Sequence, residues 1–301
     1  MKVDRAQRQR ELSAVKKEKS KARRARRAAI ARGEKIEVPK PRTIEDMREQ
    51  DVTLCVPLDP EVEGENQLDE FVSFEGEDAR EPKVMIITAE ERPGKRTLHF
   101  LKEFVEVVPN ITYFKRKTFT IKKITEMAIE KGFTALIVLQ EHAGAPDSFF
   151  LSNLPEGPTS YWKLTNLKLG QEIKGSASCN SEHKPEVVLK NFSTRLGLRI
   201  GRQLGSLFPK SSDEQGRRVV TFHNQRDFIF FRHYRYEFKD LGNDDEELDK
   251  RSKERCALME IGPRFTIKLR SLQLGTFNTK EGEYEFLWRP DSQVSRKAFA
   301  L

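Results

Sequence analysis

A stretch of fourteen residues occurs twice in the chain, and this internal repeat constrains the fold more than any other feature. Residues 157–170 read GPTSYWKLTNLKLG and residues 262–275 read GPRFTIKLRSLQLG, with seven of the fourteen positions identical. A weaker echo lies upstream, where four residues parallel four others: Leu98, Phe104, Val108 and Pro109 match Leu198, Leu204, Phe208 and Pro209. Because the two echoes occur in the same order, at offsets of 105 and 100 residues, we predict a duplication.

The spacing of apolar residues along the chain indicates the fold class of each half. Short apolar runs typical of buried strands alternate with helical spacing: strands at 84–88, 111–114 and 135–139, helices at 98–108 and 121–128. Alternating strands and helices favour an α/β layer. We therefore predict an α/β fold of two pseudo-symmetric halves, about residues 83–170 and 185–275.

Charge is strongly segregated along the chain. The 301 residues include 55 Lys and Arg against 47 Asp and Glu, a formal net charge of +8. Residues 1–35 carry a net +10, whereas residues 51–82 carry a net −10. We predict a basic helical N-terminal arm over residues 1–50, an acidic linker over 51–82 and a globular domain over 83–301. The arm is either a solvated tail or a segment that binds RNA or directs nuclear import.

Residue types also limit the cellular setting. The three cysteines, Cys55, Cys179 and Cys256, lie far apart and form no C-x-x-C pair, so we expect reduced thiols in an intracellular protein. No apolar stretch is long enough to span a bilayer, and the first residues do not have the apolar core of a secretion signal. We expect a location in the cytosol or nucleus and no membrane partner.

A basic loop precedes the first predicted helix. Residues 91–97 read ERPGKRT and follow the strand at 84–88. A helix N-terminus offers free N–H groups and a partial positive charge, so it suits phosphate. The loop has one glycine and no adjacent Lys-Ser/Thr pair, which argues against an ATP-binding loop. Arg92, Lys95 and Arg96 are therefore candidates for contact with RNA phosphates, and the alternative is a solvent-exposed basic turn.

A second basic element is predicted as a helix over residues 186–207. Its latter part places four apolar residues on one face: Leu196, Ile200, Leu204 and Leu207. The opposite face carries Arg195, Arg199 and Arg202, whose guanidinium groups match phosphate oxygens in pairs. Three glycines between these faces predict close approach of another backbone. We predict that reversing the three arginines to Glu weakens RNA binding and leaves the fold intact; the alternative is a solvated face.

Two further strands are predicted in residues 219–238, which read VVTFHNQRDFIFFRHYRYEF and turn at residues 224–227. Aromatic residues interleaved with arginine can stack on RNA bases, although the phenylalanines are more typical of a core strand. Arg226, Arg232 and Arg235 are candidates for RNA contact. The basic residues in the second copy of the repeat complete the candidate set: Arg264, Lys268 and Arg270.

Motifs of catalysis and of cofactor binding are missing from the sequence. The five histidines show no H-E-x-x-H spacing, and no G-x-S-x-G motif occurs. We expect no enzyme activity, no metal and no cofactor. The alternative is a metal-dependent RNA-processing nuclease that assembles its carboxylates from distant positions.

Four segments together resemble the Brix domain: LPEGPT at 154–159, FSTRLG at 192–197, TFHNQRD at 221–227, and GPRF at 262–265 continuing to Gly275-Thr276. The resemblance covers about residues 80–301, and the acidic insertion at 240–249 departs from it. It implies a fold akin to anticodon-binding domains and a nuclear, nucleolar location. It also implies that the chain binds precursor rRNA of the large (60S) subunit and other ribosome assembly factors, without catalytic residues. The alternative within the same family is a factor of the small-subunit processome.

Overall fold

The protein was analysed as a computed structural model. The structure describes residues 13, 17, 20, 21, 24, 47–49, 53–55, 62, 64, 69–74, 79–177, 183–210, 217–240, 254–277, 282–290, 295 and 297–301. The chain divides into two compact units, Met1–Met47 and Arg48–Leu301. The predicted basic arm and the acidic insertion at 240–249 lie almost wholly outside the described residues. All that follows concerns the second unit.

The first half of the second unit begins with alternating strands and helices and ends in three antiparallel strands. Its elements are β1 (Val84–Thr88), α3 (Lys95–Val107), β2 (Ile111–Phe114), α4 (Ile121–Glu130), β3 (Ala135–His142), β4 (Ala145–Asn153) and β5 (Thr159–Lys168). The Thr120 hydroxyl accepts a hydrogen bond from Lys123 N and caps α4, and Gly132 at φ 71° follows its end. The strands and helices predicted for this half are confirmed.

The second half begins with a similar order of strand, helix and strand. Its elements are β6 (Glu186–Lys190), α5 (Arg195–Gly205), β7 (Arg218–Gln225), β8 (Phe228–Asp240), β9 (Glu254–Glu260), β10 (Arg264–Gln273) and β11 (Tyr284–Leu287). The helix predicted over 186–207 is wrong in its first part, which forms β6. The β-branched Val187 and Val188 favour a strand, Asn191 at φ 64° ends it, and the Thr194 hydroxyl caps α5 by accepting from Gly197 N.

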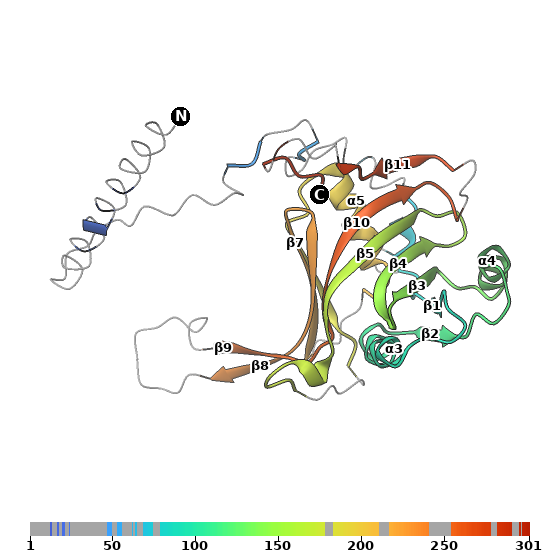
Figure 1. The fold of residues 1–301 in the computed structure, drawn as a ribbon, viewed down its shortest axis with the longest axis horizontal. Coiled ribbons are helices and arrows are strands. Elements are labelled where there is room, and N and C mark those ends of the chain that lie inside the picture. Colours follow the sequence, from blue (N-terminus) through green and yellow to red (C-terminus); the bar gives the residue numbers. More distant parts are fainter. Residues whose placement is uncertain are drawn as a thin grey trace, which may run out of the picture. The chain divides into compact units, whose positions relative to one another are not determined.

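One sheet joins the two halves, with the two copies of the repeat at its centre (Figure 1). The strand order is β2-β1-β3-β4-β5-β10-β8-β7-β6, with β11 beside β10 and β9 beside β8. The repeat strands β5 and β10 run antiparallel, pairing Lys168 with Arg264 and Thr159 with Gln273. On either side, β1 runs parallel to β3 and β6 runs parallel to β7. The predicted α/β fold of two pseudo-symmetric halves is therefore confirmed.

The glycines that bound the repeat meet in two symmetric contacts. A Cβ atom at Gly157 would lie 2.7 Å from the carbonyl carbon of Gly275, and one at Gly262 would lie 2.7 Å from Gly170 Cα. Gly157 and Gly262 also adopt φ values of 104° and 94°, which other residues rarely adopt. The repeat keeps these glycines because each half closes against the backbone of the other.

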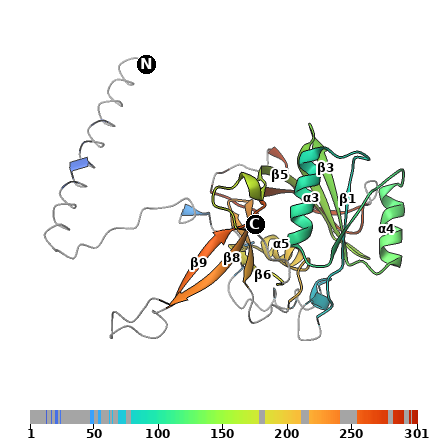
Figure 2. The same cartoon turned by 90° about the horizontal axis from the view of Figure 1, so that it is seen from below.

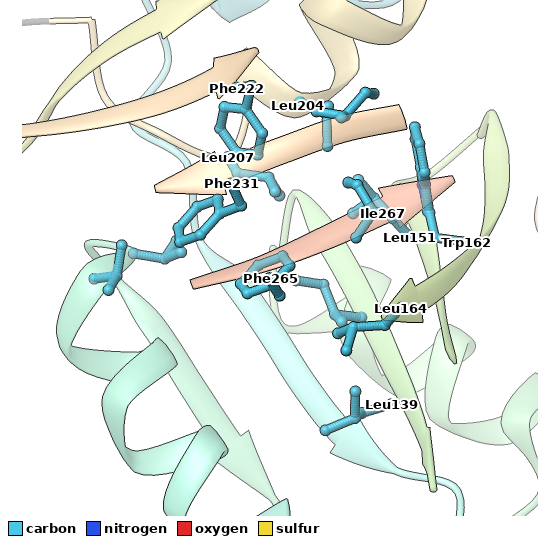
Figure 3. Packing of buried hydrophobic residues seen from close by; sticks show 14 of the residues in the cluster. Leu139, Leu151, Trp162, Leu164, Leu204, Leu207, Phe222, Phe231, Phe265 and Ile267 are labelled. Atoms are coloured by element: carbon cyan, nitrogen blue, oxygen red, sulfur yellow. The ribbon is translucent and has the colours of Figure 1, made fainter. Parts of the chain in front are cut away.

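The main core lies between the sheet and the helices α3 and α5. Trp162, Phe231, Ile267 and Leu272 are fully buried there, and the rings of Phe231 and Phe265 stack with centroids 4.3 Å apart (Figure 3). Burying one such large side chain stabilises the fold by about 1.5–3 kcal/mol.

A second, smaller core lies on the other side of β1 and β3, under α4 (Figure 2). Beyond those two strands, no helix among the described residues covers that face. We call this side of the central strands β5, β10, β8 and β7, over which no described helix lies, the uncovered face.

Candidate nucleic-acid interface

A group of cations and aromatic rings lies on this uncovered face. Lys268 and Arg270 belong to β10, Phe228 begins β8, and Trp288 directly follows β11. Lys268 Nζ lies 4.8 Å from the centre of the Phe228 ring and 4.9 Å from that of the Trp288 ring. Arg270 Cζ lies 4.1 Å from the centre of the Trp288 ring. We call these four residues the cation–aromatic cluster.

The strand pattern explains why these cations point away from the core. Ile267 and Leu269, the neighbours of Lys268, are buried against the helices. Successive side chains of a strand point to opposite faces, so Lys268 points to the uncovered face. Arg270, two residues further on, shares that face by the same alternation, and both cations contact the same indole ring. A register shift after Leu269 then returns Leu272 to the core side. Lys163 of β5 pairs directly with Lys268 and adds a third cation.

The electrostatic character of this face is positive. Partial burial lowers the pKa of Lys268, the charge of Arg270 lowers it further, and Asp227 raises it. Lys163 is balanced by Asp147, whose Oδ1 lies 2.5 Å from Lys163 Nζ. In the described part of the chain, no carboxylate lies within ion-pair distance of Lys268 or Arg270. Two neighbouring cations without an ion-pair partner among the described residues favour binding of an external polyanion.

The β7–β8 turn places a further arginine beside the cluster. Arg226 and Asp227 adopt φ values of 55° and 63°, as a tight two-residue hairpin turn requires. The Asp227 carboxylate accepts hydrogen bonds from the backbone N–H groups of Ala300 and Leu301, both at 2.9 Å. These bonds hold the turn in place, and with it the exposed Arg226, which lies two residues before Phe228 in the sequence.

Two other candidates from this part of the chain are paired with a carboxylate inside the protein. Arg264 Nε donates to Glu260 Oε1 at 2.8 Å, and Arg232 Nε lies 3.9 Å from the same oxygen. Burial lowers the pKa of Arg232, and the charge of Arg264 lowers it further. Arg235 lies in β8 opposite Arg218 of β7. Arg232 and Arg264 therefore share an internal carboxylate.

A carboxylate lies beside the N-terminus of α3. Glu141 accepts hydrogen bonds from Gly94 N at 2.9 Å and from the Thr97 hydroxyl at 2.7 Å. These donors are the N-cap N–H and a side chain, so binding of an RNA phosphate by the first backbone N–H groups of α3 stays a prediction. Arg96 pairs with Glu172 at 2.9 Å, whereas Arg92 and Lys95 are exposed. Contact of Arg92 and Lys95 with RNA stays a prediction.

Two of the three predicted arginines of α5, Arg199 and Arg202, are paired with carboxylates, which we call the acidic clamp: Asp69, Glu70 and Glu285. Arg195 is exposed, and its contact with RNA stays a prediction. Arg199 lies 2.8 Å from Glu285 and 3.2 Å from Glu70, and Arg202 lies 3.1 Å from Asp69. Burial by itself would lower the pKa of Arg199, but the nearby carboxylates raise it. Arg199 and Arg202 are therefore neutralised inside the protein, against the prediction that they face RNA.

The acidic clamp also involves residues 51–82, the stretch predicted as an acidic linker. Phe71 is 1% exposed, and its ring lies 6.0 Å from the Arg202 guanidinium. Leu54 forms a β-bridge with Thr194 at the start of α5, and Arg195 N donates to Thr53 O at 3.1 Å. The described residues of this stretch thus pack against the α5 region.

Sequence reasoning found two members of the cluster and missed two residues of this face. Lys163 stands at the repeat position that matches Lys268, so the repeat itself was a signal that both lie at the centre of the sheet. No local sequence pattern could identify Trp288 as part of the cluster, because only the pairing of β11 with β10 brings it over Arg270.

Two further observations bear on metals and membranes. Among the residues that the structure describes, no group of three or more His, Cys, Asp or Glu side chains could hold a metal ion. Within the same residues, no helix is long and apolar enough to cross a membrane.

The family follows from the sequence motifs and the duplicated fold. The family model of the Brix domain matches residues 90–271. The chain therefore belongs to the Brix domain family, and the resemblance drawn from its motifs is confirmed.

Particular relatives are also similar over most of the chain. It is 42% identical over 264 residues to ribosome production factor 1 of Pongo abelii, covering 87% of this chain and 72% of that protein. It is 41% identical over 291 residues to the probable ribosome production factor 1 of Drosophila melanogaster, covering 95% of this chain and 69% of that protein. Among solved structures, a probable ribosomal biogenesis protein from Aeropyrum pernix K1 aligns with 12% identity and a TM-score of 0.45, covering 62% of this chain and 96% of that one.

Proposed function

We propose that this protein is a ribosome biogenesis factor that binds precursor rRNA and supports maturation of the large (60S) subunit in the nucleolus, without catalysing a reaction. The cation–aromatic cluster carries the RNA-binding part of the proposal. Aromatic rings stack on unpaired bases, and neighbouring cations neutralise the phosphates between them. Membership of the Brix domain family and the names of the relatives support the ribosomal context.

The geometry favours a single-stranded RNA segment over a duplex. Lys268 and Arg270 lie against Trp288, so a base that stacks on the exposed Phe228 brings its phosphates within reach of both cations. The exposed Arg226 extends the positive surface beside Phe228. Stacking tolerates any base, so we expect weak sequence preference. The rigid domain then presents its remaining surfaces to other assembly factors.

Salt dependence tests whether phosphate contacts dominate. Fluorescently labelled single-stranded fragments of precursor rRNA would be titrated with the full chain at several salt concentrations. Each phosphate contact releases counterions, so affinity falls steeply as salt rises, with a slope of about −0.7 per contact in a log–log plot. Affinity that does not respond to salt would contradict the proposal.

A charge-matched pair of double variants locates the site. Lys268→Gln with Arg270→Gln removes two cations of the cluster, and Lys122→Gln with Lys123→Gln removes two from α4. We expect the double variant of Lys268 and Arg270 to bind RNA about tenfold or more weakly and to reduce the salt slope by about 1.4. The double variant of Lys122 and Lys123 should bind like the unmodified protein. Equal affinities of the two double variants would exclude the cluster as the RNA site.

Co-purification tests the subunit assignment. The tagged protein is expected to isolate particles that contain large-subunit precursor rRNA. Particles with only small-subunit precursor rRNA would overturn that assignment but would not contradict the proposed RNA-binding surface.

A further inference from the structure

A pocket lies beside α4, at the β2 end of the sheet. The smaller core under α4 takes its buried strand residues from β1 and β3. The edge strand β2 lies beyond β1 in the strand order, and its last residue, Phe114, is 38% exposed. The pocket, of about 370 Å³, is lined by α4, β1 and the loop that follows β2. This volume falls within the range of small-ligand sites.

The lining of the pocket is largely apolar. Met85 and Ile87 of β1 and Ile124 of α4 line it and are buried. Phe114 and Phe119 also line it, and Phe119 is 45% exposed. Exposed rings beside an apolar pocket offer flat surfaces on which a planar group can stack.

Four cations surround this apolar lining. Lys115, Arg116 and Lys117 directly follow β2, Lys131 directly follows α4, and all four line the pocket. Lys131 Nζ lies 6.0 Å from the centre of the Phe114 ring. In the described part of the chain, Lys115, Lys117 and Lys131 form no ion pair with a carboxylate. The pocket therefore favours an anionic ligand that also has an apolar, planar part.

Arg116 holds the loop after β2 in place. Its Nε donates to Phe119 O at 3.0 Å, and its Nη1 donates to Ala89 O, directly after β1, at 3.0 Å. The next residue, Thr120, caps α4. These bonds fix Phe119 relative to β1 and α4, so a ligand meets a pocket whose loop needs little reordering.

The pocket and the cation–aromatic cluster lie on the same side of the sheet. Phe150 of β4 packs against the smaller core, and its ring stacks on that of Tyr161 of β5 with centroids 4.5 Å apart. Lys163, two residues further along β5, faces the same way and pairs with Lys268 of the cluster. One RNA strand can therefore follow this side of the sheet and reach both sites.

We propose that the pocket binds one unstacked nucleotide of the RNA strand that the cluster holds, an inference that rests on the proposed function. The base enters the apolar interior and stacks on Phe119. Its neighbouring phosphates meet Lys115 and Lys117 at one end of α4 and Lys131 at the other. A nucleotide fits better than an acidic peptide, because the base uses the rings and the phosphates use the cations.

A ring substitution tests whether a base enters the pocket. Phe119→Ala in the full chain should bind a single-stranded precursor rRNA fragment about tenfold more weakly, because stacking is lost. An abasic strand of the same length should bind this variant and the unmodified chain equally at low salt. Phe238→Ala, at another exposed ring, is the matched control and should bind like the unmodified chain. Unchanged affinity of Phe119→Ala for the fragment, or an equal loss on both strands, would overturn the inference.

A charge-matched pair tests the phosphate contacts. Lys115→Gln with Lys117→Gln should reduce the salt slope by about 1.4. Lys122→Gln with Lys123→Gln removes the same charge from α4 residues that do not line the pocket, and should leave the slope unchanged. All four lysines are exposed, so both double variants should keep the unmodified melting temperature. Equal slopes in the two double variants would exclude phosphate contacts at the pocket.

Photo-cross-linking separates this inference from the proposed function. An RNA fragment with 4-thiouridine, irradiated with the full chain, should cross-link to residues 114–119 as well as to the cluster. Cross-links at the cluster alone would overturn the inference and leave the proposed function intact, whereas an RNA that does not bind at low salt would overturn both. In pre-ribosomal particles, a photoreactive phenylalanine analogue at position 119 should cross-link to RNA. Cross-links from that position only to an acidic protein segment would overturn the inference.

Discussion

At the residue scale, the buried His233 makes stability depend on pH. Its Nδ1–H donates to Gly262 O at 2.8 Å, and among the described residues its Nε2 has no hydrogen-bond partner. Burial lowers the pKa of His233 from 6.5 to about 4, and the charge of Arg218 contributes. The unfolded chain thus binds this proton more tightly than the folded one, so stability is lost as the pH falls from 6.5 towards 4.

We expect this histidine to account for about 2 kcal/mol of the stability lost between pH 7 and pH 5. Urea unfolding at both pH values measures the loss. The variant His233→Phe should lose less stability than the unmodified chain over this interval. His223→Phe, at a half-buried position in β7, should follow the unmodified chain. Parallel pH profiles for all three proteins would contradict the role of His233.

Substitutions at two glycines of the repeat distinguish the cost of a steric contact from the cost of backbone strain. Gly262 and Gly275 both have positive φ, 94° and 80°, but only at Gly262 would a Cβ atom meet another backbone. Gly275→Ala should cost about 1 kcal/mol in the free energy of unfolding, from strain alone. Gly262→Ala should cost about 3 kcal/mol, because it adds the contact with Gly170. Denaturant unfolding measures the loss of unfolding free energy in both variants. Equal losses would show that the structure around Gly262 adjusts to the added methyl group without cost.

At the element scale, the acidic clamp holds α5 through charges drawn from distant parts of the chain. Arg202 is 11% exposed and Asp69 6% exposed. Burial and the hydrogen bond with Glu70 raise the pKa of Asp69 to about 7, against the opposing effect of the two arginines. Replacing Arg202 by Glu leaves the buried Asp69 with Arg199 as its remaining cation, 3.5 Å away, and places a second carboxylate beside it.

The variant Arg202→Glu should therefore lose about 3 kcal/mol of unfolding free energy, with the RNA affinity of the folded protein unchanged within twofold. Lys102→Glu, an exposed position on α3, should be neutral for stability. Thermal unfolding and RNA titration of both variants measure these changes in stability and RNA affinity. This outcome replaces the sequence-based expectation that reversing the α5 arginines spares the fold and weakens RNA binding. A stable Arg202→Glu protein that binds RNA poorly would restore that expectation.

Local patterns in the sequence predicted most elements and few of the side-chain partners. Short apolar runs identified β1 and β3, which are buried on both faces between the two cores. Helical spacing identified α3 and α4, because each buries one face against a core. It extended α5 over β6, since five residues are too few to separate strand from helix spacing. Lys268 and Arg270 could be predicted as candidates from residue type. Their contact with Trp288 could not, because it depends on strand pairing.

At the scale of the whole molecule, duplication has produced one cooperative unit. The repeat predicted two halves, and the structure joins them through β5 and β10 into a single sheet with a continuous core. Phe265 shows the continuity: its ring stacks on Phe231 of the second half and contacts Phe100 of α3 in the first, with centroids 5.6 Å apart. Neither half can lose its packing without exposing the core of the other.

We therefore expect the globular unit to unfold in a single transition. Circular dichroism of the backbone and fluorescence of the buried Trp162 should give coincident denaturant curves. Phe265→Ala should shift both curves together, by about 3–5 kcal/mol, because its cavity opens in the core that the two halves share. Phe238→Ala, at a ring that is 63% exposed, should shift neither. A Phe265→Ala protein in which one signal is lost before the other would mean that the halves fold separately, and that the central pair of strands is only a hinge between them.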